Sequence, residues 1–374
     1  MTRVDGRSTG LCKGTQVEQL PMRVIFVAVL LICILLLARG FGAEASLEFY
    51  VSPTGNNNSS GAKQEPFARL TRAQDAIRES TKTGQMADIV VFLRGGIHKL
   101  KEPLVFGPED SGTDKFSITY RAYPGEKPII SGGRRITGWK PGPGKIWQAE
   151  LPEVKAQRWY FRQLFVDGQR ATRARTPNAD NKAPYLKVKY AELKEEDGTW
   201  KVTLAPGQVR NWKNMADVEI FVLGVWDVMR KRLAGVDQAK GEVILAPPHV
   251  DAHQHSPRPG RWCFFENAIE MLDQPGEWHL DRPTGILSYW PLEGQDMSKI
   301  EVVAPVLSQL LEIAGTDKQL VRNVHFKGLS FQYAQWPLPA WGFAGRQGVR
   351  CMFRIKAQDS WARPSCGDSQ IHAA

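Results

Sequence analysis

Residues 89–96 read IVVFLRGG, and this stretch decides the fold class. Five consecutive apolar residues, most of them β-branched or aromatic, predict a short buried strand that ends at the glycine pair. Similar short runs follow, and Gly, Pro or Asp separates each from the next. They are Leu104–Phe106, Ile118–Tyr120 and Ile129–Ile130. Short strands with almost no helix between them predict an all-β protein, either a sandwich, a barrel or a parallel β-solenoid.

Toward the N-terminus of this run, the sequence predicts one more strand and one helix. Phe49–Val51 is a short apolar run that precedes a loop rich in Gly, Asn and Ser. The apolar residues between Leu70 and Glu79 fall at helical spacing. We therefore take residues 46–135 as an N-terminal part of the solenoid with one short helix.

The pattern changes near residue 136. Nine of the twelve Trp residues lie between Trp139 and Trp290, and the predicted strands are longer and alternate in polarity. These strands are 163–167, 218–222 and 241–245. Alternation is typical of antiparallel sheets with one solvated face. We therefore predict a separate inserted β-rich domain over residues 136–298.

After Ile300 the first pattern returns, with short runs at 310–313, 324–326 and 329–331. The sequence thus predicts that the solenoid resumes over residues 299–343. Residues 344–374 show no alternation and no apolar stripe that could cap a solenoid, so we expect a disordered tail there.

The first 45 residues predict a signal peptide. Val24–Ala38 is an unbroken apolar run flanked by arginines, too short for the roughly 30 Å hydrocarbon core of a membrane. Ala43-Glu44-Ala45 gives the small-x-small pattern of a cleavage site, and we expect translation to start at Met22. We expect a secreted, periplasmic or cell-surface protein with no stable membrane span after cleavage; an uncleaved anchor is the alternative.

Composition excludes several classes of protein. The chain has 374 residues, of which 42% are hydrophobic and 24% charged, so wholesale disorder is excluded. The formal charge of +10 is dispersed over the chain, which argues against a nucleic-acid partner. After removal of the signal, three cysteines remain without a CxxC pair, so neither a disulfide scaffold nor a zinc site is expected.

Several stretches together resemble one known family. They are Phe49-Tyr50-Val51-Ser52-Pro53-x-Gly55, Pro66–Leu70, Pro128–Gly133, Leu164–Gly168, Arg173-Ala174-Arg175-x-Pro177-Asn178, Glu266-Asn267, Leu272–Trp278, Leu280-Asp281 and Tyr289–Pro291. In this order they are similar to secreted proteins of glycoside hydrolase family 141. The resemblance covers roughly residues 47–343.

The resemblance implies a right-handed parallel β-helix interrupted by an antiparallel β-sandwich-like insertion. It also implies cleavage of plant or algal polysaccharide, with catalytic carboxylates on later rungs of the β-helix. Beyond residue 347 the expected strand-turn units do not continue. We therefore expect incomplete C-terminal rungs and possible inactivity, and a frameshift or premature stop near Gly348 is the hypothesis that explains them.

Hydrolysis of a glycosidic bond requires two carboxyl groups, one of them protonated near neutral pH. Asp227 and Glu266 are the candidate catalytic residues, although solvated surface roles are the alternative. Glu270, Asp273 and Asp281 are further carboxylate candidates, and turn roles are favoured for the last two because Pro and Gly lie nearby.

Aromatic and basic side chains are the candidates for sugar binding. Trp226 and Trp262 could stack on sugar rings, and so could Trp278 and Trp290, with core packing as the alternative. Arg173 and Arg175 alternate onto one strand face and could bind a carboxylate, with a structural ion pair as the alternative. The expected partner is a polysaccharide or oligosaccharide.

No metal or cofactor is expected. His249, Asp251, His253 and His255 have the spacing of ligands on one strand face, but flanking prolines mark a loop. Two other functions remain open. One is a polysaccharide lyase on the same fold, which would need a base and clustered Ca²⁺ ligands. The other is a non-catalytic glycan-binding or structural surface protein.

Overall fold

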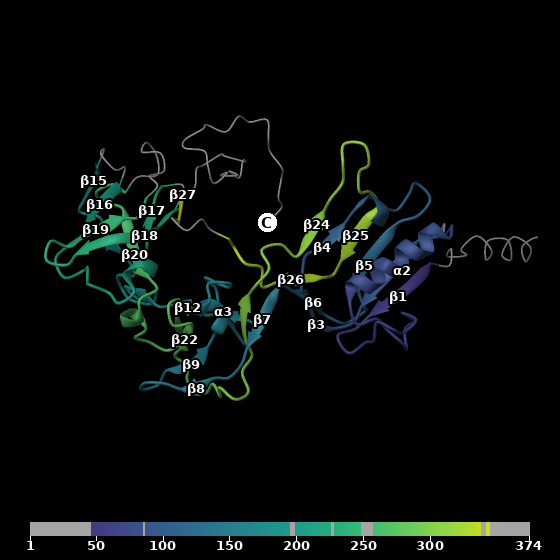
Figure 1. Ribbon diagram of the computed structural model, residues 1–374, viewed down its shortest axis with the longest axis horizontal. Coiled ribbons are helices and arrows are strands. Elements are labelled where there is room, and N and C mark those ends of the chain that lie inside the picture. Colours follow the sequence, from purple (N-terminus) through teal and green to yellow (C-terminus); the bar gives the residue numbers. More distant parts are fainter. Residues whose placement is uncertain are drawn as a thin grey trace, which may run out of the picture.

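The computed structural model describes residues 46–84, 87–194, 199–225, 228–247, 257–337 and 342–344. The expected signal peptide and nearly all of the expected tail lie outside these residues. The described chain is all-β apart from one long helix and a few short helical turns. Figure 1 shows two groups of elements, one around α2 and one around β15–β20. Within the described residues, no helix is long and apolar enough to cross a membrane.

The group around α2 is built from parallel pairings. One sheet has the order β1-β2-β5-β25, a second β3-β6-β26 and a third β4-β24, and every neighbour pair within them is parallel. Their strands are β1 (Leu47–Val51), β2 (Ile89–Leu93), β5 (Ile118–Ala122), β25 (Val324–Lys327), β3 (Gly96–Lys99), β6 (Pro128–Ser131), β26 (Ser330–Gln332), β4 (Leu104–Phe106) and β24 (Leu311–Ile313). Strands therefore occur at each of the apolar runs quoted from the sequence.

Alternate side chains of these strands form one apolar core. Ile89, Val91 and Leu93 are fully buried, as is Ile118, which lies beside Ile89 in register. Helix α2 (Leu70–Lys82) buries the face that carries Leu70, Ala73 and Ile77 against the same core. It is three residues longer than the predicted 70–79. At the helix, the Gln74 side chain donates a hydrogen bond of 3.0 Å to the Val105 carbonyl of β4.

Chain segments from both ends of the sequence meet in each parallel sheet. β25 pairs with β5, β26 with β6 and β24 with β4, so the strands after residue 300 add one layer to those before residue 135. The chain leaves the parallel sheets through β7 (Gly133–Ile136) and returns to them through β23 (Val302–Pro305). These two strands pair with each other, so the exit and the return lie side by side. The approach is close at Gly132, where an added Cβ would lie 2.3 Å from the Leu310 side chain.

The intervening residues form mainly antiparallel sheets. A nine-stranded sheet has the order β13-β20-β17-β18-β19-β16-β15, with β14 beside β20 and β27 beside β18. Its strands are β13 (Arg175–Thr176), β14 (Leu186–Lys187), β15 (Tyr190–Lys194), β16 (Thr199–Thr203), β17 (Glu219–Leu223), β18 (Val228–Asp237), β19 (Glu242–Leu245), β20 (Trp262–Glu266) and β27 (Gly342–Ala344). One face covers an apolar core that includes Ile220, Val222, Cys263 and Phe265.

A five-stranded sheet has the order β12-β21-β22-β9-β8, and its strands come from before β13 and after β20 in the sequence. Its strands are β12 (Thr172–Arg173), β21 (Glu277–Asp281), β22 (Ile286–Tyr289), β9 (Trp147–Glu150) and β8 (Lys140–Pro141). The fully buried Trp278 is at the centre of its core. A small sheet of β7, β23, β10 (Phe165–Val166) and β11 (Gln169–Arg170) completes this part. β10 is shorter than the predicted 163–167 because Asp167 and Gly168, both at positive φ, turn the chain.

We expect Ile118→Ala to lower the free energy of unfolding of the parallel part by about 2–5 kcal/mol. Ile118 is fully buried between β2 and β25, so its removal leaves a cavity where both segments of the chain meet. Urea unfolding followed by circular dichroism measures the change. Val105→Ala on exposed β4 surface is the control and should change stability by about 0.5 kcal/mol at most. Equal losses in both variants would contradict this account of the core.

Candidate functional site

Two of the residues that the sequence suggested for chemistry, Trp262 and Glu266, lie on one face of the nine-stranded sheet. Side chains alternate between the two faces of a strand, so Trp262, Phe264 and Glu266 of β20 point away from the core that holds Cys263 and Phe265. Their cross-strand neighbours on β17 are Leu223, Phe221 and Glu219. This face is charged and dry at its Glu266 end and aromatic and exposed at its Trp262 end.

Glu219 occupies the dry end and has no exposed surface. Three guanidinium groups surround its carboxylate. Arg173 donates to Oε2, Arg230 lies 2.5 Å from the same oxygen, and Arg162 donates to Oε1 over 3.2 Å. Burial alone would raise the pKa of Glu219, but the three arginines outweigh it and hold the pKa well below its usual range. The group is thus ionised, fully paired and closed to a substrate.

Arg173 links the two large sheets of this region. It belongs to β12 of the five-stranded sheet, whereas Glu219 belongs to the nine-stranded sheet. The same guanidinium donates to the Tyr160 hydroxyl over 2.8 Å and to the Asn267 side chain over 3.2 Å. Arg173 is 5% exposed, so this placement favours the structural ion pair over a substrate contact.

Glu266 lies directly opposite Glu219 in register and is the more accessible of the two carboxylates. Its side chain is 17% exposed, and its Oε2 lies 3.8 Å from Arg173 and 3.9 Å from Arg230. Burial raises the pKa of Glu266, and the neighbouring arginines oppose that rise only in part. Among the candidate catalytic residues, Glu266 is the one that the described chain contains. Asp227 lies outside the described residues.

Arg175 holds the loop that leads to the exposed end of this face. Its Nε and Nη2 each donate over 3.0 Å, to the carbonyl oxygens of Pro177 and Pro184 respectively. The guanidinium also stacks on Phe264, 3.8 Å from the ring centroid. Arg173 and Arg175 thus serve different sheets, contrary to the single strand face expected, because the chain passes from β12 to β13 between them.

The exposed end carries two aromatic rings and a lysine. Trp262 is 45% exposed and Tyr185 is 37% exposed, with ring centroids 6.2 Å apart. Lys187 pairs with Trp262 in register, and its ammonium lies 4.5 Å from the centre of the Trp262 ring. We refer to Tyr185, Lys187 and Trp262 as the aromatic platform.

Glu270 accepts a hydrogen bond from the Lys213 backbone N–H, and Trp290 packs partly buried against the core of the nine-stranded sheet. The other residues suggested by the sequence divide into two groups. Trp226 and the four possible ligands His249, Asp251, His253 and His255 lie outside the described residues. Trp278 is core, and Asp273 and Asp281 accept hydrogen bonds from the side chains of Asn178 and Thr284 respectively. In the part of the chain that the structure describes, no group of His, Cys, Asp or Glu residues could hold a metal ion.

Sequence reasoning did not identify Glu219 or its partners Arg162 and Arg230. A charged residue inside the apolar run 218–222 was the available signal, because a buried strand rarely carries an unpaired carboxylate. Tyr185 was also missed, since a single tyrosine in a loop rich in polar residues carries no pattern.

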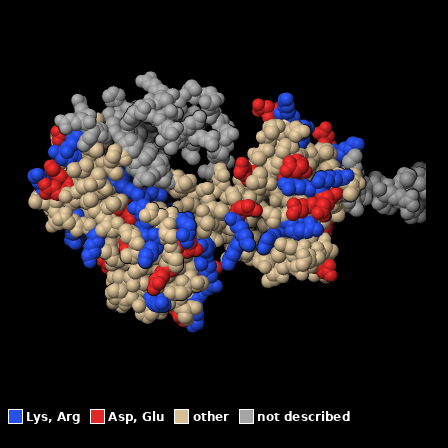
Figure 2. Space-filling model, viewed as in Figure 1, with Lys and Arg blue, Asp and Glu red and all other residues tan. Residues whose placement is uncertain are grey.

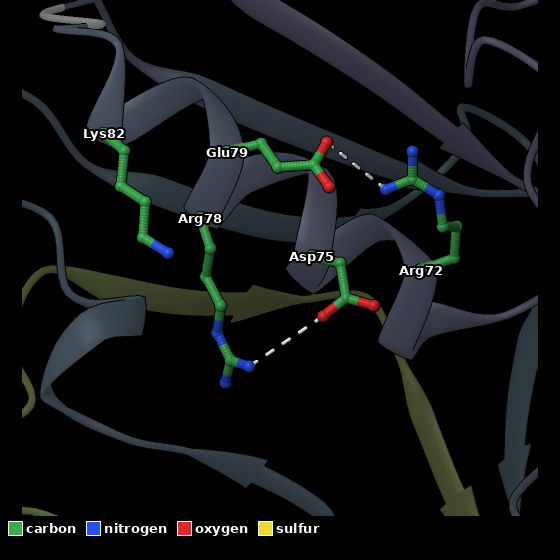
Figure 3. A pocket seen from close by; sticks show the side chains of 5 residues that line it. All are labelled: Arg72, Asp75, Arg78, Glu79 and Lys82. Atoms are coloured by element: carbon green, nitrogen blue, oxygen red, sulfur yellow. Dashed lines mark ion pairs between the residues drawn. The ribbon is translucent and has the colours of Figure 1, made fainter.

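A pocket on the other group of elements is a poor candidate. Figure 3 shows that all five lining side chains come from α2 and alternate in charge. The ion pairs Arg72–Glu79 and Arg78–Asp75 span 3.8 and 3.9 Å, and Arg78 also binds Asp110 in bidentate fashion. No aromatic ring lines the pocket, so it offers no stacking surface for a sugar.

Charges on the visible surface do not gather by sign. Figure 2 shows Lys and Arg interspersed with Asp and Glu over the described residues of this face. Such mixing gives no single electrostatic field that would attract a polyanion. The absence of a nucleic-acid partner stays a prediction.

We expect Glu219→Gln to destabilise this region by about 3–5 kcal/mol, because three buried guanidiniums lose their counter-charge. Thermal and urea unfolding of the purified chain measure the loss. Glu192→Gln is the matched control, since its ion pair with Lys201 is accessible to solvent and an exposed pair contributes little to stability. A Glu219 variant as stable as wild type would contradict the structural role.

Glu277 predicts a pH dependence of stability. It has no exposed surface, and burial raises its pKa to about 7. The folded state therefore keeps a proton that the unfolded chain loses near its ordinary pKa of about 4.3. Between these two values stability falls as pH rises, by at most about 1.4 kcal/mol per pH unit from this group. In Glu277→Gln this contribution should vanish, which urea unfolding at about pH 5 and about pH 7 can measure. The same pH slope in both proteins would disprove it.

Comparison with known proteins supports the carbohydrate interpretation. Residues 144–292 match the model of the GH141 insertion domain. A solved structure described as "Glycoside hydrolase" is 28% identical, with a TM-score of 0.67, over 78% of this chain and 51% of that chain. The chain thus spans about half the length of that structure.

Two further structures match more weakly. "The complex structure of XylC with xylose" is 14% identical with a TM-score of 0.33, over 77% of this chain and 35% of that one. "Rhamnogalacturonan lyase" is 24% identical with a TM-score of 0.19, over 23% and 22% of the two chains. No curated protein matches. The chain is therefore glycoside hydrolase-like, with a middle part similar to the GH141 insertion domain.

Proposed function

We propose that this chain belongs to an exported carbohydrate-active protein of the hydrolase type that acts on plant or algal polysaccharide. One observation carries the proposal: the match of residues 144–292 to the GH141 insertion domain within a chain whose fold is similar to a solved glycoside hydrolase. Export is proposed from the apolar run 24–38 and the Ala43-Glu44-Ala45 pattern.

We propose that the three parallel sheets are the walls of one right-handed parallel β-helix. Residues 46–135 and 299–343 would form its rungs, and residues 136–298 the insertion. The pairing of β24, β25 and β26 onto β4, β5 and β6 supports this, because each sheet gains one strand per turn of the chain. The right hand follows from the preference of parallel crossovers.

The proposed reaction uses two carboxyl groups. A general acid must hold its proton near neutral pH, and burial in the presence of a second carboxylate favours such a state. Glu266 fits this part best among the described carboxylates, because its pKa is raised and part of its side chain is exposed. Glu219 does not fit the role of the second catalytic carboxyl group, because three arginines already pair with its carboxylate.

Glycan binding without turnover is the second candidate. The aromatic platform favours it, because two exposed rings and a lysine form a surface for ligand contact that needs no catalytic pair. A lyase has less support, since the described residues contain no acidic cluster for Ca²⁺.

We expect the purified full chain to bind plant polysaccharide and, if hydrolytic, to release reducing ends without new unsaturation. A panel of plant and algal polysaccharides is assayed for reducing sugar and for ultraviolet absorbance of unsaturated products. Glu266→Gln should then lower turnover by at least about 100-fold, with Glu293→Gln as the exposed control. Unsaturated products would favour the lyase, and binding without turnover would favour the second candidate. Neither binding nor turnover on any glycan would refute the proposal.

A further inference from the structure

The aromatic platform is built as a rigid surface. Phe264 is stacked on Phe221 with ring centroids 4.5 Å apart and planes 9° apart, and it also contacts Tyr185 at 6.0 Å. Trp262 is two residues from Phe264 on the same strand and face, so both rings are fixed by one strand. Because the rings are held before any ligand arrives, binding would cost little ordering entropy.

The loop beside the platform is fixed as well. Arg175 donates hydrogen bonds to the carbonyls of Pro177 and Pro184, and its guanidinium lies 5.8 Å from the Tyr185 ring centroid. Tyr185 directly follows one of these anchored residues. Arg175 is therefore a positioning residue for the platform, and its charge is turned toward the loop backbone.

Lys187 gives the platform its charge. Among the described residues, no carboxylate lies within ion-pair distance of its ammonium, which lies over the Trp262 ring. Glu266 is four residues from Trp262 along β20, roughly 13 Å away at the rise of a strand. That carboxylate already faces Arg173 and Arg230. The exposed end of the face thus combines stacking rings with a positive charge that has no carboxylate partner among the described residues.

Two kinds of chemistry fit such a surface. The face of an aromatic ring carries partial negative charge and attracts the C–H groups on one side of a pyranose ring. An ammonium group such as that of Lys187, held over one face of the Trp262 ring, binds a carboxylate as a point charge. A sugar that offers both an apolar C–H face and a carboxylate is a uronic acid.

We propose that Tyr185, Lys187 and Trp262 form a binding site for uronate-bearing glycan chains, with the rings stacking on the pyranose faces and Lys187 pairing with a carboxylate. This inference rests on the proposed function, because it takes a carbohydrate as the ligand. It goes further in naming the charge of that carbohydrate and a contact surface separate from Glu266.

The test compares two ligands with the same sugar chain, one with free carboxylates and one with neutral methyl esters. Oligogalacturonides and the same chains with methyl-esterified carboxyls are titrated into the full chain by isothermal titration calorimetry. We expect the acidic chains to bind at least about tenfold more tightly at low salt, and the preference to shrink as ionic strength rises. Trp262→Ala should weaken binding of the acidic chains about tenfold, and Lys187→Gln should abolish the preference between the two ligands.

Matched variants separate these effects from misfolding. Trp336→Ala removes another exposed tryptophan, and Lys240→Gln removes another exposed lysine, so both should bind like wild type. Because Trp262 and Lys187 are exposed, their variants should keep wild-type thermal unfolding. Equal binding of both ligands by wild type, or wild-type binding by Trp262→Ala, would overturn the inference.

The outcomes distinguish this inference from the proposed function. If the chain hydrolyses or binds neutral polysaccharide but no oligogalacturonide, the platform inference fails and the proposed function stands. If the chain acts on no glycan and binds none, both fail together.

Discussion

The pairing of strands from the two ends of the sequence is the constraint on which the rest of the structure depends. Ile118 of β5 lies beside Ile89 of β2 on one side and Val324 of β25 on the other. A core that needs both segments closes only when the long middle part lets its ends meet. The pairing of β7 with β23 meets that condition, and the lack of a side chain at Gly132 allows the close approach. Such long-range pairings imply slow folding relative to a helical protein of similar size.

The middle part also joins two sheets whose buried apolar cores are separate. Arg173 of the five-stranded sheet reaches Glu219 of the nine-stranded sheet, and both groups are dry. A buried ion pair gains little net stability over apolar packing, since desolvation offsets the attraction. What it imposes is geometry, because any other arrangement of the two sheets would leave a charge buried without a partner. The Arg173-Ala174-Arg175 segment thus acts as the junction, with one arginine fixed to each side.

Much of the strand pattern was predictable, and most of the site was not. The apolar content of runs such as Ile89–Leu93 and Val324–Phe326, and the glycines that bound them, predict strands. The change in the strand pattern near residue 136 coincides with the change from parallel to mainly antiparallel strand pairing. Contacts between distant charges have no local signature, however. Nothing near Glu219 in sequence shows that Arg162 and Arg173 meet it, because the encounter depends on how two sheets are set together.

A single strand, β20, carries both a structural and an exposed end, and its exposure decides which end can recognise a ligand. At Glu219, opposite Glu266, the charges are fully paired, so a ligand there would have to displace arginines from a buried carboxylate, whereas Glu266 keeps 17% of its side chain exposed. At Trp262 the ring is about half exposed and the nearby lysine faces no carboxylate of the described residues, so a ligand gains contacts without breaking an ion pair between described residues. The arginines of this face therefore build the scaffold, and the lysine at its edge remains available for recognition.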